Sequence, residues 1–206
     1  MEVEELRPRL WCWKLRHPES GELVSSYAEF GDDVLVLFDP LVPPADTDAA
    51  DRFWEALDRE IEQHGPPAIL LTVYRHARSS QEILERHPEG RLFAHEPQAE
   101  QIAERAAYTE TFSLHEVLPG HVIPFDAGPG GEVIFWAARH RAMVAGDVLA
   151  AGEDGVRLAP TDSMPREQLV ETLRPVLVRS VDMLLLTHGG PVLEDAHGAL
   201  ERALQA

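Results

Sequence analysis

The chain has 206 residues, 44% of them apolar, which is enough to bury a sizeable core, and we expect a single domain over residues 1–206. Its 18 basic and 36 acidic residues give a net charge of −18, which opposes binding to a polyanion, so we expect no nucleic-acid partner. No apolar run approaches the roughly 18 residues of a membrane span, and the charged start lacks the features of a signal peptide, so we expect a cytoplasmic protein without a membrane partner. The lone Cys12 excludes an internal disulfide and a cysteine-based zinc cluster.

The first forty residues read as strands. Residues 11–18 alternate bulky and polar side chains before a proline, and we interpret His17 there as a turn residue rather than a site residue. Residues 23–30 and 34–38, separated by a Gly-Asp-Asp turn, predict a hairpin whose second strand is apolar throughout. Asp39 ends that strand, where its carboxylate can accept backbone N–H bonds from the following turn.

Helices and strands alternate in the next stretch. Residues 43–48 form a loop that ends in possible helix caps, and Phe53, Trp54, Leu57 and Ile61 then recur at helical spacing, which predicts an amphipathic covering helix that stops at a Gly-Pro pair. Residues 91–94 predict a short strand, and Pro97 can open a further helix. His95 lies where that strand ends, but an isolated His-Glu pair is weak evidence for a ligand.

The most informative stretch lies between these elements. Residues 68–71 form a short apolar run, typical of a buried strand, and Thr72 ends it. Ser79 and Glu82 have the spacing of a capping box, so we expect the loop of residues 73–78 to join a strand end to a helix start. Sites in layered α/β folds favour that position.

The second half is predicted to contain further strands and two helices. The expected strands cover residues 114–123, 132–137, 142–145 and 181–187, one helix begins at Ser163 and Pro165, and a terminal helix covers residues 195–204. Two of these apolar runs end in a polar residue next to glycine, Gly146-Asp147 in one case and His188-Gly-Gly in the other. His121 follows a Pro-Gly pair, and we interpret it as a loop residue rather than a ligand.

The order of these elements, with Thr72, Asp147 and His188 at the ends of strands, resembles the metallo-β-lactamase superfamily over most of the chain. The resemblance implies an α/β (α+β) fold, a four-layer αββα sandwich. It also implies that Asp147 stands where the family presents an Asp that bridges two metals, and that His188 stands where the family supplies its last histidine.

The family's metal motif, Thr-His-x-His-x-Asp-His, is missing. Set on that pattern from Thr72, the ligand positions fall on Val73, Arg75, Ala77 and Arg78, and His76 takes a spacer position. Arginine keeps its proton and offers a planar fork of donors, so a guanidinium in a former cation site repels a metal and retains positive charge. We therefore expect no two-metal centre and no required cofactor.

The resemblance and the arginines together lead to a functional hypothesis. We expect a pseudo-hydrolase that binds a small anionic molecule through Tyr74, Arg75, His76 and Arg78. Alternatively, one Arg neutralises Asp147 internally and the other faces solvent, and we expect Arg78 to be the nearer one.

Two other classes of function stay open. Asp147, His188 and His76 would then be the catalytic candidates, holding one zinc, iron or manganese ion in a mononuclear metallohydrolase, because three protein ligands and a water suffice. The other class is a non-catalytic scaffold that acts through its surface.

Overall fold

The computed structural model describes residues 1–152, 154–159 and 164–205. Within these residues, strands run in the order β7-β6-β5-β4-β3-β12-β10-β9-β8, with β1, β2 and β11 paired at the side. The strands are β1 Glu2–Arg7, β2 Leu10–Arg16, β3 Leu23–Phe30, β4 Leu35–Phe38, β5 Pro67–Leu70, β6 Arg91–His95, β7 Glu110–Phe112, β8 Val122–Asp126, β9 Val133–Ala137, β10 Ala142–Gly152, β11 Gly155–Leu158 and β12 Met183–His188. The helices are α1 Asp48–His64, α2 Ser80–Arg86, α3 Ala99–Ala103, α4 Arg166–Leu173 and α5 Ala196–Gln205, with 3-10 turns η1 Tyr74–Ser79, η2 Glu96–Gln98, η3 Pro119–His121, η4 Pro129–Gly131 and η5 Arg174–Val178.

The strands form two half-sheets, β1–β7 and β8–β12, which pair strand to strand at one position and are also linked by the bond from the Val133 N–H to the Thr72 carbonyl oxygen at 2.9 Å. In the described residues, β3 and β12 pair through a single register position, Val24 opposite His188. The Tyr27 hydroxyl donates a second bond across this junction, to the carbonyl oxygen of Leu186 at 2.7 Å. Because so short a ladder cannot fix two sheets side by side, side-chain packing between the half-sheets must hold them.

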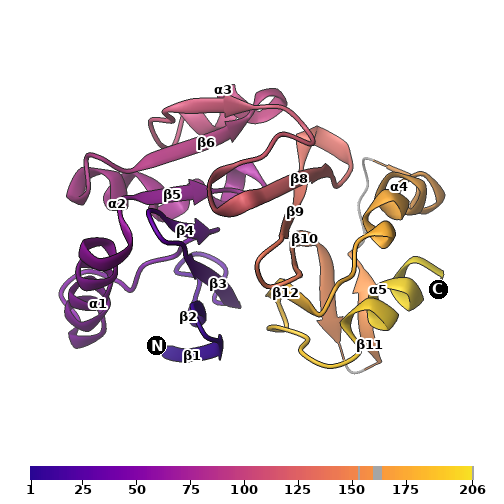
Figure 1. Cartoon of the computed structure of the whole chain (residues 1–206), viewed down its shortest axis with the longest axis horizontal. Helices are drawn as coiled ribbons and strands as arrows, with labels where there is room; N and C mark the ends of the chain where they lie inside the picture. The colour runs from indigo at the N-terminus through magenta and orange to yellow at the C-terminus, as the bar shows by residue number, and fades with distance from the viewer. Residues whose placement is uncertain (153, 160–163, 206) are drawn as a thin grey trace.

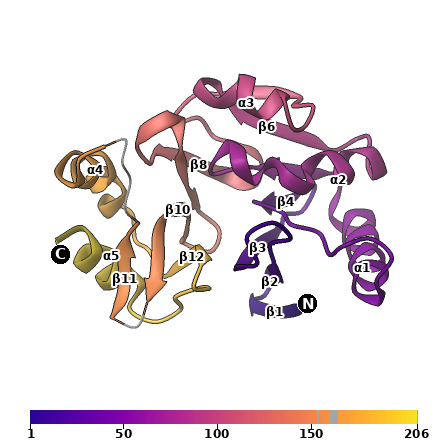
Figure 2. The same ribbon diagram turned by 180° about the vertical axis from the view of Figure 1, so that it is seen from behind.

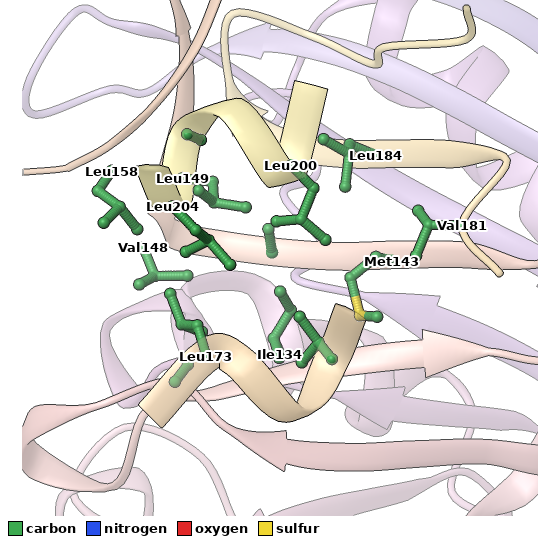
Figure 3. Close-up of a cluster of buried hydrophobic side chains, with 14 of the residues drawn as sticks. Ile134, Met143, Val148, Leu149, Leu158, Leu173, Val181, Leu184, Leu200 and Leu204 are labelled. Atoms are coloured by element: carbon green, nitrogen blue, oxygen red, sulfur yellow. The ribbon is translucent and has the colours of Figure 1, made fainter. Parts of the chain in front are cut away.

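Three apolar clusters separate the layers. The central cluster takes side chains from both half-sheets, and the Phe38 and Phe135 rings meet there at 6.0 Å between centroids. Helices α1, α2 and α3 cover the outer face of the first half-sheet, and α4 and α5 cover the outer face of the second (Figures 1 and 2). Figure 3 shows this last cluster, to which α5 contributes Leu200, α4 contributes Leu173 and β12 contributes Leu184. The order of layers is therefore αββα.

Several expected elements are confirmed. The apolar runs at residues 34–38, 69–71 and 183–186 fall on β4, β5 and β12, whose apolar side chains are buried on both faces. Helix α1 begins after Thr47, whose Oγ1 accepts the Ala50 N–H at 3.1 Å, as the capping residues of the loop before it predict.

Other expectations are wrong. Strands β1 and β11 were not predicted, because they carry no continuous apolar run, and residues 114–121 form no strand, since β7 ends at Phe112 and β8 begins at Val122. The capping box at Ser79 does not form, because its Oγ accepts the Val42 N–H at 3.0 Å instead. The helix expected from Pro165 is present, however, as α4, with Pro165 as its N-cap and Arg166 as its first residue, while Ser163 lies outside the described residues. None of the helices in the described ranges is long and apolar enough to cross a membrane.

Candidate functional site

A cleft of about 730 Å³ opens where the two half-sheets join. Its walls come from the β2–β3 turn, the segment after β4, the 3-10 turn η1, the middle of β10 and the end of β12. These elements bring together residues that the sequence or the resemblance singled out, namely His17, Arg75, His76, Arg78, Asp147 and His188.

Asp147 is aimed into the cleft by an irregularity in β10. The register of β10 against β12 shifts on both sides of Gly146, as at a β-bulge, and Gly146 has a φ of 55°. A Cβ at position 146 would collide with Oγ1 of Thr72. Glycine is therefore required for β10 to approach the end of β5 closely enough for Asp147 to reach the site.

Asp39 lies beneath the cleft as a fixed acceptor. Its Oδ1 accepts the Thr72 N–H at 2.8 Å, and its Oδ2 accepts the Thr72 hydroxyl at 2.6 Å. The same Oδ2 lies 3.0 Å from Nδ1 of His76. Asp39 therefore accepts bonds after its strand, as the sequence predicts, and it also supports a residue of the site.

His76 links two carboxylates. Its ring is buried, with Nδ1 toward Asp39 and Nε2 at 3.2 Å from Oδ1 of Asp147. Burial acts to lower the pKa of His76, but the Asp39 and Asp147 carboxylates outweigh it and raise the pKa to about 9. The ring is therefore an imidazolium at neutral pH, with a donor on each nitrogen.

Asp147 is surrounded by basic side chains. His188 Nε2 lies 3.3 Å from its Oδ1, beside His76, and Arg75 Nη2 lies 3.4 Å from its Oδ2. Burial acts to raise the pKa of Asp147, but His188 and His76 outweigh it and hold the pKa well below its usual range. The carboxylate is therefore ionised and compensated by neighbouring side chains.

Arg75 is shared between two carboxylates. Besides Asp147, it contacts Glu132 at 3.3 Å, and its side chain remains 49% exposed. Burial raises the pKa of Glu132, and the Arg75 guanidinium opposes that rise. The sequence patterns assign no role to Glu132, which stands directly before β9.

Arg78 does not pair with Asp147 as expected. Its Nη2 donates to the Asp39 carbonyl oxygen at 3.2 Å, and its Nε is buried without a hydrogen-bond partner. In the described part of the chain, no carboxylate oxygen lies within 4.0 Å of this guanidinium, so the arginine that pairs with Asp147 is Arg75. Burial lowers the pKa of Arg78 from its ordinary high value.

Tyr74 lies apart from the cleft. Its backbone N–H donates to Gln98 Oε1 at 2.7 Å, and its ring packs under the guanidinium groups of Arg75 and Arg105, at 5.4 and 5.6 Å from the ring centroid. It is not among the residues that line the cleft. Its contacts position η1 rather than a ligand.

The three other histidines considered in the sequence analysis have no role in the centre of the cleft. His17 lines the cleft, and its Nδ1 accepts the N–H of Glu19 at 3.4 Å, as expected of a turn residue. His95 is buried, with Nδ1 at 2.7 Å from the Gly131 carbonyl oxygen and its ring stacked on Phe112. His121 is exposed and lines a different hollow.

The side chains present do not fit a two-metal centre. Val73 and Ala77 stand at two of the ligand positions that the resemblance assigns, and both are fully buried without a donor atom to offer. The Arg75 guanidinium at 3.4 Å from Asp147 places positive charge where a cation would bind. Over residues 1–152, 154–159 and 164–205, no group of three or more His, Cys, Asp or Glu side chains stands ready to hold a metal ion.

Comparisons with known proteins agree with this architecture. No family profile and no curated protein matches the sequence. A metallo-β-lactamase from Pontibacter korlensis is 12% identical, with a TM-score of 0.73 over 99% of this chain and 98% of its own. A metallo-β-lactamase family protein from Thermus thermophilus is 17% identical, with a TM-score of 0.67 over 98% of this chain and 80% of its own.

A third structure carries the same fold within a longer chain. The metal-soaked Flv1 flavodiiron core from Synechocystis sp. PCC6803 is 14% identical, with a TM-score of 0.71 over 99% of this chain and 60% of its own. Identities this low establish the architecture and leave the chemistry to the site itself. The four-layer sandwich expected from the sequence is confirmed, and the chain has the metallo-β-lactamase fold.

Proposed function

We propose that the cleft binds a small molecule with one carboxylate or phosphate group, and that the protein is a pseudo-hydrolase. The observation that carries this proposal is the state of Arg78. Its guanidinium lines the cleft, its Nε is buried without a partner, and no carboxylate among the described residues compensates its charge within 4.0 Å. Arg78 is half-buried and interacts with the Asp39 and Asp147 carboxylates only at longer range, so an anionic ligand that accepts two of its N–H bonds would stabilise its charge.

The rest of the cleft sets the size of the ligand. Arg16 and Arg105 line it without a carboxylate partner in the described structure, which adds positive charge around Arg78. Three exposed glutamates, Glu19, Glu22 and Glu82, line the same opening. Their charges repel a polyanion, so the arrangement favours a compact ligand with a single acidic group.

The proposal is tested by titrating the protein with inorganic phosphate and with acetate in a calorimeter. We expect Arg78→Gln to weaken binding of the tighter probe by about 10- to 100-fold, the usual effect of losing a charged hydrogen bond. Arg174→Gln, at an exposed position outside the cleft, is the matched control and should leave affinity unchanged. Equal affinity of the Arg78→Gln variant and the unmodified protein for both probes would overturn the proposal.

A mononuclear metallohydrolase is the second candidate, and one observation favours it. The Nε2 atoms of His76 and His188 lie 3.2 and 3.3 Å from one oxygen, Oδ1 of Asp147, which is buried without a well-aligned hydrogen bond. Ligand atoms about 2.0–2.2 Å from a tetrahedral zinc ion stand roughly 3.3 Å apart, so each of the two nitrogen–oxygen distances matches ligand spacing, although the three side chains do not form a ready metal-binding group in the described residues. A bound divalent ion would lower the pKa of a water molecule at this site.

Metal binding at this position requires changes at two residues of the cleft. His76 must lose the proton on Nε2, and Arg75, which is half-exposed, must swing away from Asp147. Elemental analysis after incubation with zinc, iron or manganese, with a screen of ester and phosphodiester substrates, tests it. Stoichiometric metal with turnover that His188→Gln abolishes would favour the hydrolase over the anion-binding protein.

A further inference from the structure

A second cavity, of about 400 Å³, lies on the outer side of the first half-sheet, between α1 and strands β1–β3 (Figure 1). It shares no lining residue with the cleft described above. Aromatic and aliphatic side chains make up most of its wall, and the residues used below are Trp11, Trp13, Phe30, Phe53, Ala56 and Arg52. Its volume lies within the range of about 300–1,000 Å³ that is usual for small-molecule sites.

The aromatic wall is held in place by the fold. The Trp13 and Phe53 rings meet at 5.7 Å between centroids, and the Trp11 and Phe30 rings meet at 6.5 Å, both pairs tilted. Trp13 Nε1 donates to the Leu41 carbonyl oxygen at 2.8 Å, so the indole N–H already has a hydrogen-bond acceptor. Since Trp13, Phe30 and Phe53 are otherwise buried in the core, the cavity is formed before any ligand arrives.

The opening of the cavity carries positive charge. Arg59 and Glu60 of α1 pair with each other at 3.0 Å, and Glu60 also lies 3.7 Å from His64. Arg52, nearer the start of α1, has no carboxylate within 4.0 Å in the described ranges. Acidic residues outnumber basic ones by 36 to 18 in the chain, so an exposed guanidinium without a carboxylate within 4.0 Å beside an apolar cavity offers a contact for an anionic group.

We propose that this cavity binds an amphipathic monocarboxylate, independently of the anion-binding cleft. The apolar body of the ligand lies among Trp11, Trp13 and Phe53, where it removes aromatic surface from water. Its carboxylate lies at the opening on Arg52, whose guanidinium can bond both oxygens. An apolar ligand without the acidic group makes only the first set of contacts.

Calorimetric titration with decanoate and with 1-decanol separates these two contributions. We expect saturable binding of both, tighter for decanoate, and a loss of about 10- to 100-fold for decanoate in the Arg52→Gln variant, with 1-decanol unchanged. Ala56→Trp, on the half-buried side of α1, should fill the cavity and abolish binding of both probes. A blue shift of the tryptophan emission on addition of decanoate, as the half-exposed Trp11 loses contact with water, reports on the same wall without a substitution in the core.

Several results would overturn this assignment. Decanoate that binds more weakly than about 1 mM to the unmodified protein would exclude the site. Equal decanoate affinity in Arg52→Gln would remove the proposed polar contact. A loss of decanoate binding in Arg78→Gln, which changes the other cleft, would show that the probe binds there. Arg52 lies on the exposed face of α1, so its variant should fold even if Ala56→Trp does not.

Discussion

His76 and Asp147 meet at 3.2 Å between Nε2 and Oδ1, and this contact joins η1, which follows β5 of the first half-sheet, to β10 of the second. The opposite nitrogen of the same ring lies 3.0 Å from Asp39. An imidazolium between two carboxylates compensates charges that burial would otherwise make costly. The chain thus balances the acidic groups of its cleft with its own side chains.

Stability should depend on the protonation of His76. The two carboxylates raise its folded pKa from 6.5 to about 9, so its contribution is fully present below about pH 6.5 and is lost as pH rises through 9. A shift of this size corresponds to about 3 kcal/mol. Urea unfolding from pH 6 to 10 should show a fall in the free energy of unfolding, and His76→Gln should flatten it. The exposed His121→Gln is the control, and an unchanged slope in His76→Gln would contradict the assignment.

Asp147→Asn should destabilise the protein. His76 and Arg75 would lose a charged partner, and we expect a loss of about 1–3 kcal/mol, because the Asp147 side chain keeps 25% exposure and solvent screens part of the interaction. The folded pKa of Asp147 is depressed, so its contribution is present above pH ~4 and is lost as pH falls further. Urea titrations at pH 3 and 7 should therefore differ less for the variant. Glu19→Gln, at the exposed opening, should have no such effect.

Gly146→Ala should disrupt the approach of β10 to β5. The new Cβ would collide with Thr72 Oγ1, and a φ of 55° is unfavourable for alanine, so we expect a loss of about 2–5 kcal/mol. Gly21→Ala is the matched control, since Gly21 has a φ of 72° but open space around it. Thermal unfolding of both variants separates the effect of the collision with Thr72 from the effect of the positive φ. Similar losses of stability in the two variants would show that the collision costs little.

Arg75→Gln should make the cleft more receptive to a divalent cation. The guanidinium 3.4 Å from Asp147 disfavours a second positive charge there, and its removal should tighten zinc binding. The side chain is 49% exposed, so the folded state should lose only about 0–1 kcal/mol. Competition with a fluorescent zinc chelator measures the affinity, with Arg105→Gln as control. Zinc binding no tighter than in the unmodified protein would weaken the case for any metal at this position.

The sequence predicts the buried parts of this fold well. Strands β4, β5 and β12 are apolar on both faces, so their composition alone identifies them. Strand β1 has no such signal, because its glutamates are exposed and its hydrogen bonds to β2, rather than apolar burial, hold it in place. Strand length and register at sheet edges depend on the neighbouring strand, which a local pattern does not contain.

Most residues of the candidate site could be predicted from the sequence, but the pairing between them could not, because that pairing also depends on segments distant in the chain. Asp147 and His188 come after apolar runs and stand next to a glycine, which marks both positions in the sequence, although β10 continues through Asp147 to Gly152. In a 3-10 turn, residues three apart lie on one face, so Arg75 and Arg78 both line the cleft. Which of them reaches Asp147 depends on where β10 crosses η1, and no local pattern encodes that distance.

The cleft lies beside the single register position at which β3 pairs with β12, so a ligand there can affect how the two half-sheets move relative to each other. Val24 and His188 both line the cleft. A molecule that contacts Arg78 and His188 at once would therefore add a non-covalent link between the two half-sheets, next to the position where β3 pairs with β12. Occupancy of the cleft is then coupled to the rigidity of the whole molecule. Slower amide exchange along β3 and β12 would report a bound molecule even when no reaction follows.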